Sequence, residues 1–322
     1  LADSVYTYYP GGELKSKGKF VNDWPEGLIT EYYTDGTLKS EITYASGKQN
    51  GPFREYYPTG IKKTEGNYKD GELDGNYATY YESGQLENKS ELLEGERTGE
   101  FRHYDPQGNL LLIGHYINGK LHGANVAFYP DSTLRHSFEY DMGFKKGKDN
   151  VAYYPDGTIK MTEVVDKTGN QMITYYEESG KMILEEQRVK DVLNGYQKDY
   201  DNNGQLVSLK NYLEGKQHGL TNYYYPNGQV KEEAVYTYGD ISGERKTFYE
   251  DGSLNSVMPY SAKMKHGPYK VYYPSGAVKI DAEYGGNMKV GIWRYYDEEG
   301  TLIKTETYRR DELVETNNGP FD

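Results

Sequence analysis

The large side chains of this chain recur at a fixed spacing of 24 residues instead of gathering in long hydrophobic runs. One aromatic row comprises Tyr8, Tyr32, Tyr56, Tyr80, Tyr104, Phe128, Tyr176, Tyr200, Tyr224, Phe248, Tyr272 and Tyr296. A second row comprises Phe20, Tyr44, Tyr68, Tyr116, Tyr140, Tyr212, Tyr236, Tyr260, Tyr284 and Tyr308. A fixed period of this length is typical of repeat proteins, so each unit is expected to be one structural module.

Each unit has the pattern of a β-hairpin. Its first strand is a short run that ends in a tyrosine pair, as in FREYY at 53–57. The turn has the form YPDG or YPNG, in which proline presets φ and glycine adopts the left-handed conformation. The second strand is exemplified by TLKSEITY at 37–44, and a glycine turn such as INGK at 117–120 leads to the next unit. No segment keeps a 3.6-residue apolar period, so almost no helix is expected.

The sequence therefore predicts an all-β fold. We expect an elongated solenoid of about thirteen hairpins of 24 residues, which form a twisted, mostly single-layer antiparallel sheet. Leu14, Leu38 and their equivalents precede the second aromatic row by six residues. Because six is even, we expect both rows on one face, with Glu41, Glu65 and other charged residues on the opposite face.

Composition fits such an array better than a compact core. Hydrophobic residues make up 35% of the 322 residues, and 37 residues are tyrosine. A tyrosine ring is large and apolar while its hydroxyl tolerates water, so stacked hairpins can bury rings without a thick core. The net charge of −13 makes nucleic acids and anionic membranes poor partners. No apolar run is long enough to span a membrane, and the absence of cysteine excludes disulfides and thiolate chemistry.

The units YYTDGTLKSEITYASGKQNG at 32–51 and YYPNGQVKEEAVYTYG at 224–239 resemble the MORN-repeat variant family. The resemblance covers essentially the whole chain. It implies Gly- and Tyr-rich hairpins that stack into an elongated, twisted antiparallel sheet. It also implies protein-binding scaffolds, with lipid binding claimed for some eukaryotic members, and bacterial variant members are often labelled antitoxin-like. The resemblance supplies no catalytic residues.

We expect one repeat array over residues 1–322. The least regular stretch is 148–193, in which Gln171 occupies a glycine position and a further glycine series is lost at Lys167 and Asp191. This stretch is interpreted as drift within the array, or as a kink or a boundary between two stacks.

No motif in the chain is typical of catalysis. His122, His218 and His266 each precede a repeat glycine, and the other histidines show no spacing typical of a metal site. Nucleophile, zinc-protease and phosphate-loop motifs do not occur. Each Asp-Gly turn has one acid and lacks the several oxygen ligands of a calcium loop. We therefore expect no enzyme activity, metal or cofactor.

The second residue of each tyrosine pair is the candidate binding row. Asp or Glu replaces tyrosine in some units, so this row is expected to be exposed. The candidate tyrosines are Tyr9, Tyr33, Tyr57, Tyr81, Tyr225, Tyr249 and Tyr273. A basic row precedes it and includes Arg54, Arg102, Lys246, Lys270 and Arg294. Exposed tyrosine beside arginine is typical of protein-binding hot spots. In the alternative, the tyrosines cover the second face of the sheet and the basic residues neutralise neighbouring Glu.

The preferred hypothesis is a non-catalytic scaffold that binds a protein partner along a rigid, preformed surface. A carbohydrate-binding surface and an antitoxin-like, partner-neutralising role are the alternatives, and an enzyme is the least favoured. The absence of cysteine and of an initial Met favours an extracytoplasmic location in a bacterium, whereas a cytoplasmic location stays open. The oligomeric state is left open.

Overall fold

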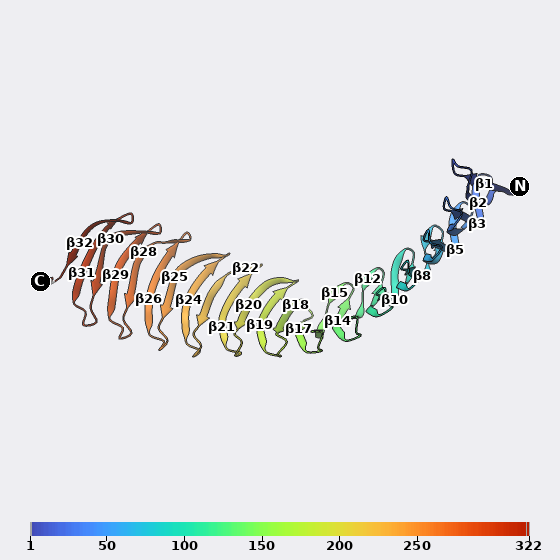
Figure 1. Cartoon of the computed structure of the whole chain (residues 1–322). Coiled ribbons are helices and arrows are strands. Elements are labelled where there is room, and N and C mark those ends of the chain that lie inside the picture. The colour runs from blue at the N-terminus through green and yellow to red at the C-terminus, as the bar shows by residue number, and fades with distance from the viewer. Residues whose placement is uncertain (1, 320, 322) are drawn as a thin grey trace. The chain divides into compact units, whose positions relative to one another are not determined.

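The computed structural model describes residues 2–319 and 321, a part of the chain that contains strands and turns but no helix. Contacts between residues divide the chain into two units, Leu1–Ile159 and Lys160–Asp322. Within each unit, strands lie side by side in chain order and pair antiparallel with their neighbours (Figure 1). The predicted all-β array of hairpins is confirmed.

The first unit contains β1 (Ala2–Tyr8), β2 (Leu14–Val21), β3 (Trp24–Tyr32), β4 (Leu38–Ala45), β5 (Lys48–Tyr56), β6 (Lys62–Lys69), β7 (Glu72–Leu73), β8 (Gly75–Tyr80), β9 (Leu86–Leu93), β10 (Glu96–Tyr104), β11 (Leu110–Ile117), β12 (Lys120–Leu121), β13 (Gly123–Phe128), β14 (Leu134–Asp141), β15 (Phe144–Lys145) and β16 (Gly147–Tyr153). From the boundary onward follow β17 (Ile159–Val165), β18 (Asn170–Tyr176), β19 (Met182–Val189), β20 (Val192–Tyr200), β21 (Leu206–Leu213), β22 (Lys216–Gln217), β23 (Gly219–Tyr224), β24 (Val230–Thr237), β25 (Asp240–Phe248), β26 (Leu254–Ser261), β27 (Met264–Lys265), β28 (Gly267–Tyr272), β29 (Val278–Gly285), β30 (Met288–Tyr296), β31 (Leu302–Arg309) and β32 (Glu312–Asn318).

The same pair of backbone hydrogen bonds closes each hairpin turn. The Tyr57 N–H donates to the Ile61 oxygen and the Gly60 N–H donates to the Tyr57 oxygen, both at 2.8 Å. Gly60 has a φ of +79°, a conformation that glycine adopts without strain. The five-residue hairpin turns with this pattern begin at Tyr9, Tyr33, Tyr57, Tyr81, Asp105, Tyr129, Tyr154, Glu177, Asp201, Tyr225, Tyr249, Tyr273 and Asp297. We call their side of the sheet the turn edge, and the opposite side, where one hairpin connects to the next, the link edge.

A β-bulge beside the hairpin turns decides which side chains share a face. Glu31 pairs with Ser40, whereas the next residue, Tyr32, pairs with Leu38, so one residue of β4 has no partner. Paired residues share a face and neighbours along a strand alternate, so Leu38 and Tyr44 lie on opposite faces. The prediction that these two rows share a face is wrong, because the extra residue in the bulge reverses the alternation.

Aromatic rings cover one face, which we call the ring face. In the first unit Phe53 is 4% exposed, and its ring centroid lies 4.6 Å from that of Tyr68. A Cβ on Gly66, which pairs with Phe53, would come within 2.7 Å of the Phe53 ring. The small residue at this position therefore gives the ring room to lie against the sheet.

The ring face of the second unit has its largest aromatic cluster near the C-terminal strands. Trp293 on β30 is 4% exposed. Its ring centroid lies 5.4 Å from that of Tyr284, 5.6 Å from Tyr308 and 6.0 Å from Tyr269. Rings at these separations and tilts attract one another beyond the burial of their area.

The opposite face, which we call the charged face, alternates basic and acidic side chains across strands. Arg54 lies 3.9 Å from both Glu41 and Glu65, on the strands that flank its own. The Tyr56 hydroxyl donates to Glu41 at 3.0 Å, and the Tyr80 hydroxyl donates to Glu65. The first tyrosine of each pair therefore lies among charged groups rather than in the ring cluster.

Candidate functional site

The second tyrosine of each pair joins one repeat to the next. The Tyr57 hydroxyl donates to the carbonyl oxygen of Tyr80 at 2.8 Å. Equivalent bonds of 2.7–3.0 Å run from Tyr9, Tyr33, Tyr81, Tyr129, Tyr225, Tyr249 and Tyr273 to the carbonyl oxygens of Tyr32, Tyr56, Tyr104, Tyr153, Phe248, Tyr272 and Tyr296. We call these side chains the tyrosine clamps.

The clamps are half-buried instead of forming the exposed row that acid tolerance predicted. Acids are tolerated there because the turn itself offers hydrogen bonds to a carboxylate. Burial raises the pKa of Tyr57 and of Tyr81, so both hydroxyls remain protonated donors at neutral pH.

Lysine side chains cover several of the clamp rings. The Nζ of Lys63 lies 5.8 Å from the ring centroid of Tyr57. The other covered pairs are Lys15 and Tyr9 at 5.9 Å, Lys231 and Tyr225 at 5.6 Å, and Lys279 and Tyr273 at 5.1 Å. Each lysine lies six residues after its tyrosine, and its ammonium group is attracted to the face of the ring.

The predicted basic row lies on the charged face, beside acidic residues. The Arg102 Nε lies 2.5 Å from Glu100, and the Lys246 Nζ lies 3.9 Å from Glu233. The register places the remaining two members opposite the same acid, as Lys270–Asp281 and Arg294–Asp281. These contacts match the alternative in which basic residues neutralise acidic neighbours, and such exposed pairs add little stability.

Four hairpin turns begin with an acid and lack a clamp. In one of them, an Asp201 carboxylate oxygen accepts the N–H groups of Asn203 at 2.8 Å and Gln205 at 2.9 Å. Asp105 does the same in its own turn, and its hydrogen bonds, above all with Asn109, lower its pKa. An acid at this position therefore stabilises its own turn and not the boundary with the next repeat.

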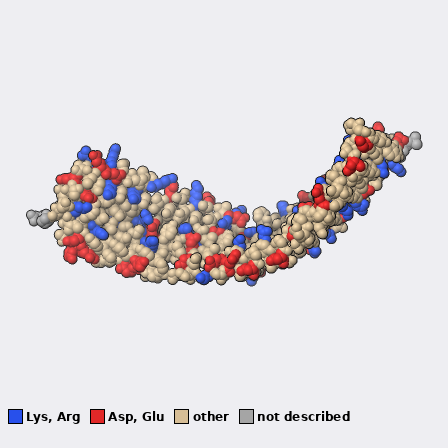
Figure 2. Space-filling model, in the orientation of Figure 1, with Lys and Arg blue, Asp and Glu red and all other residues tan. Residues whose placement is uncertain are grey.

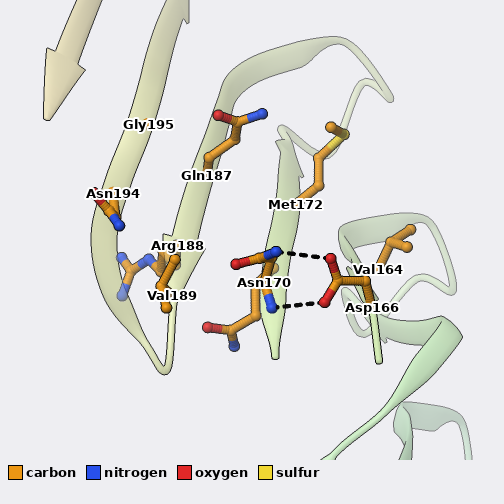
Figure 3. Close-up of a pocket in the computed structure, with 10 residues that line it drawn as sticks. Val164, Asp166, Asn170, Met172, Gln187, Arg188, Val189, Asn194 and Gly195 are labelled. Atoms are coloured by element: carbon orange, nitrogen blue, oxygen red, sulfur yellow. Dashed lines mark hydrogen bonds between the residues drawn. The ribbon is translucent and has the colours of Figure 1, made fainter. Parts of the chain in front are cut away.

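The connection between β17 and β18 forms a tight turn at the link edge. The Asp166 N–H donates to the Asn170 oxygen at 2.9 Å and the Gly169 N–H to the Asp166 oxygen at 3.1 Å, which is the pattern of a hairpin turn. Asp166 also accepts a bond from Thr168. It accepts two more from Asn170, which Figure 3 shows. These bonds hold the pKa of Asp166 well below its usual range.

A groove lies beside this tight turn. It has a volume of about 560 Å³ and is lined by, among others, Val164, Asp166, Met172, Gln187, Arg188 and Asn194 (Figure 3). The lining mixes aliphatic, amide, carboxylate and guanidinium groups.

A buried polar cluster lies beside the groove, on the ring face of the sheet. Gln171 is 6% exposed, and its amide nitrogen donates to Glu163 at 2.7 Å and to Asp191 at 2.8 Å. Its amide oxygen accepts the Asp191 N–H at 2.7 Å. The sequence offered one signal of this cluster, a glutamine in a glycine position, but not its partners. In the described part of the chain, no group of three or more His, Asp or Glu side chains is arranged to hold a metal ion.

Negative charge gathers at the turn edge. The thirteen hairpin turns contain one basic residue, Lys181. Their fourteen acidic residues are Glu13, Asp35, Glu82, Asp105, Asp131, Asp156, Glu177, Glu178, Asp201, Glu250, Asp251, Asp297, Glu298 and Glu299. This excess equals the whole net charge of −13, and Figure 2 shows the acidic side chains along this edge of the second unit.

Helices that would cross a membrane are absent from residues 2–319 and 321. No curated protein matches the chain. Solved chains that match it include one in the crystal structure of TcdB2-TccC3-TEV, which is 15% identical over 94% of this chain and 15% of that chain, with a TM-score of 0.17. A chain in the crystal structure of TcdB2-TccC3 is 11% identical over 96% of this chain and 23% of that chain, with a TM-score of 0.19. A chain of the Photorhabdus luminescens Tc holotoxin pore is 12% identical over 96% of this chain and 22% of that chain, with a TM-score of 0.14. This chain spans less than a quarter of each of these chains.

A family model agrees with the repeat read from sequence and structure. The model of the MORN repeat variant matches residues 25–46, 49–70, 73–92, 97–118, 193–214, 217–238, 241–262, 265–284 and 289–310. These nine segments cover more than half of the chain. The chain therefore belongs to the MORN repeat variant family.

Proposed function

We propose that the chain is a non-catalytic scaffold that recognises a protein partner on the charged face of its second unit. The observation that supports this most is a set of exposed aliphatic side chains on that face. Val164 and Met172 lie opposite each other and are 45% and 41% exposed. Leu220 and Val235, also opposite each other, are 40% and 38% exposed. Exposed apolar side chains among polar ones are typical of protein interaction surfaces.

The clamps favour the same function because they hold neighbouring repeats in one arrangement before a partner arrives. A preformed surface loses less conformational entropy on binding than a flexible one. The acidic turn edge adds a preference for partners with basic side chains at that edge, since complementary charge accelerates association. The glycan alternative gains no support from the clamp rings, which are half-buried and partly covered by lysine.

Capture from the source organism followed by titration tests the proposal. The immobilised chain is expected to retain a protein that mass spectrometry identifies and that then binds in isothermal titration. The double variant Leu220→Asp/Val235→Asp should weaken binding at least about tenfold by placing charge in the apolar contact. Ile117→Asp, which changes an aliphatic residue of the first unit that is 42% exposed, is the control and should bind normally.

Circular dichroism should show the same strand content for all variants. Two results would contradict the proposal: no protein retained by the wild-type chain, or equal affinity of the double variant and the wild type.

A further inference from the structure

The first residue of a hairpin turn varies together with the residue six positions later. Nine turns begin with tyrosine, and the residues six positions later are Lys15, Lys39, Lys63, Glu87, Arg135, Lys160, Lys231, Asn255 and Lys279. Four turns begin with Asp or Glu, and the corresponding residues are Leu111, Ile183, Val207 and Ile303. Every tyrosine turn thus has a polar residue there, and every acidic turn has an aliphatic one.

The structure of the tyrosine turns explains why their residue six positions later is polar. The clamp ring lies on the boundary between two repeats, and its hydroxyl donates to the carbonyl oxygen 23 residues later, as from Tyr225 to Phe248 at 2.9 Å. In four of these turns the lysine six positions later lies over the ring, as Lys231 does over Tyr225. A lysine suits this place because its ammonium group is attracted to the face of the ring.

The acidic turns lack the ring but keep an apolar group in its neighbourhood. The Asp201 carboxylate bonds within its own turn, so no side chain of that turn extends to the next repeat as a clamp does. Val207 nevertheless replaces the usual polar residue and is 41% exposed. A single exposed valine is common on a protein surface. Here, however, an aliphatic residue occupies this position only in the turns that lack a clamp ring, which indicates a place where another apolar group can complete the contact.

A hollow is present at the boundary where the Asp201 clamp is missing. It has a volume of about 280 Å³ and is lined by Gln205, Leu206, Tyr224, Tyr225, Pro226, Asn227 and Gly228. Tyr224 lies 23 residues after Asp201, so its carbonyl oxygen is the counterpart of the clamp acceptors. The turn that begins at Glu177 differs, because the Nζ of Lys181 already spans its boundary to the Asn202 oxygen at 2.6 Å.

We propose that the boundary between the Asp201 and Tyr225 turns is a socket for a tyrosine side chain of a protein partner. The ring of the partner lies over Val207, and its hydroxyl donates to the carbonyl oxygen of Tyr224. Eight clamps elsewhere in this chain show the same ring and hydroxyl on the same backbone group, so the chain itself is the template for the ligand. This inference deepens the proposed function and relies on it for the statement that the tyrosine comes from a protein.

Free p-cresol, the side-chain analogue of tyrosine, tests the socket without any partner. Titration of the isotope-labelled chain should shift the Val207 methyl and Tyr225 amide NMR signals saturably, with a Kd of roughly 1–10 mM for a ligand of this size. Toluene has the same ring without the hydroxyl, and we expect it to bind about threefold to tenfold more weakly. No saturable shift with p-cresol, or equal binding of toluene and p-cresol, overturns the inference.

Two reciprocal double variants provide the matched controls. Asp201→Tyr/Val207→Lys introduces a clamp whose ring fills the socket. It should abolish the p-cresol shift at Tyr225 and raise Tm. Tyr225→Asp/Lys231→Val removes a clamp and should create a second p-cresol site, seen at the Tyr249 amide. A shift at Tyr225 that persists in the first variant overturns the inference.

The same variants separate the socket from the scaffold. If a captured partner binds the wild type but not Asp201→Tyr/Val207→Lys, both proposals are supported. If it binds both equally, the socket is wrong and the scaffold stands. If p-cresol binds as expected and no partner is captured, the socket stands as a phenol site and the scaffold is wrong.

Discussion

The ring face of the second unit buries two contrasting kinds of side chain on the same antiparallel sheet. Around Trp293 it is filled by rings, whereas around Gln171 it is filled by hydrogen-bonded polar groups, including Glu163 with no exposed surface. The hairpin turns and their bulges follow the same pattern in both regions, whereas β17 and β18 pair without a bulge and are joined by the tight turn at Asp166. The comparison teaches that the repeat tolerates either filling, provided that apolar groups are packed or polar groups are satisfied.

Removal of the central ring should give the largest effect. Trp293→Ala is expected to lower the free energy of unfolding by about 3–5 kcal/mol, since it deletes a buried ring and leaves a cavity among three others. Urea-induced unfolding followed by circular dichroism measures this. The adjacent Ile292, 46% exposed, is the control, and Ile292→Ala should stay within about 0.5 kcal/mol of wild type. Equal effects of the two substitutions would show that the rings do not stabilise this region.

The polar interior should be almost as sensitive. Gln171→Met removes three hydrogen bonds from buried Glu163 and from Asp191, and we expect a loss of about 2–3 kcal/mol. Met172→Gln makes the reverse change on the exposed face and should be nearly neutral. A Gln171→Met chain as stable as wild type in the same urea experiment would mean that the polar cluster is dispensable.

Acid should weaken the aromatic region through the largely buried carboxylate of Glu306. The Tyr295 hydroxyl, then Lys304 and the Tyr308 hydroxyl, bond Glu306 and lower its pKa to about 2. A group with a lowered pKa stabilises the fold above its unfolded pKa and loses that contribution as the pH falls toward the folded value. Between about pH 5 and pH 2, wild type should lose about 1–2 kcal/mol more than Glu306→Gln. Parallel pH profiles of the two proteins in urea titrations would refute this.

The smallest effect should come from a single clamp. Tyr273→Phe keeps the ring and removes the hydroxyl that bonds the Tyr296 oxygen at 3.0 Å, so we expect a loss of about 1 kcal/mol. Amide hydrogen exchange at the boundary between these repeats should accelerate. Tyr6→Phe, at a tyrosine that is 56% exposed, should leave both unchanged. Unaltered exchange in Tyr273→Phe would mean that the hydroxyl adds no stability.

Periodicity and turn chemistry were enough to predict the hairpins, because each unit repeats the same local signals. The faces were harder to predict: a single unpaired residue in each bulge, such as Lys39, reverses the alternation and is invisible in the spacing. The clamp role of Tyr57 also escaped prediction, because its acceptor is a backbone carbonyl and any residue at position 80 would supply one. Its use as a binding residue, like that of Arg54, stays a prediction.

The polar cluster and the groove escaped prediction for a related reason. The sequence marks Gln171 as irregular but does not show which side chains it bonds, since Glu163 lies on the far side of the tight turn at Asp166 and Asp191 lies 20 residues later. Long-range partners of a single polar residue depend on register, and register here is set by bulges and turn lengths.

The clamps reach only from one repeat to its neighbour, and this has a mechanical consequence. Tension applied to the two ends of the second unit passes through its repeat boundaries in series, so the boundary with the weakest bonding yields first. Each 24-residue repeat that peels away releases roughly 80 Å of slack. Stretching this unit would therefore give a series of small ruptures, one repeat at a time, that begins at a boundary without a clamp, such as the one at Asp201.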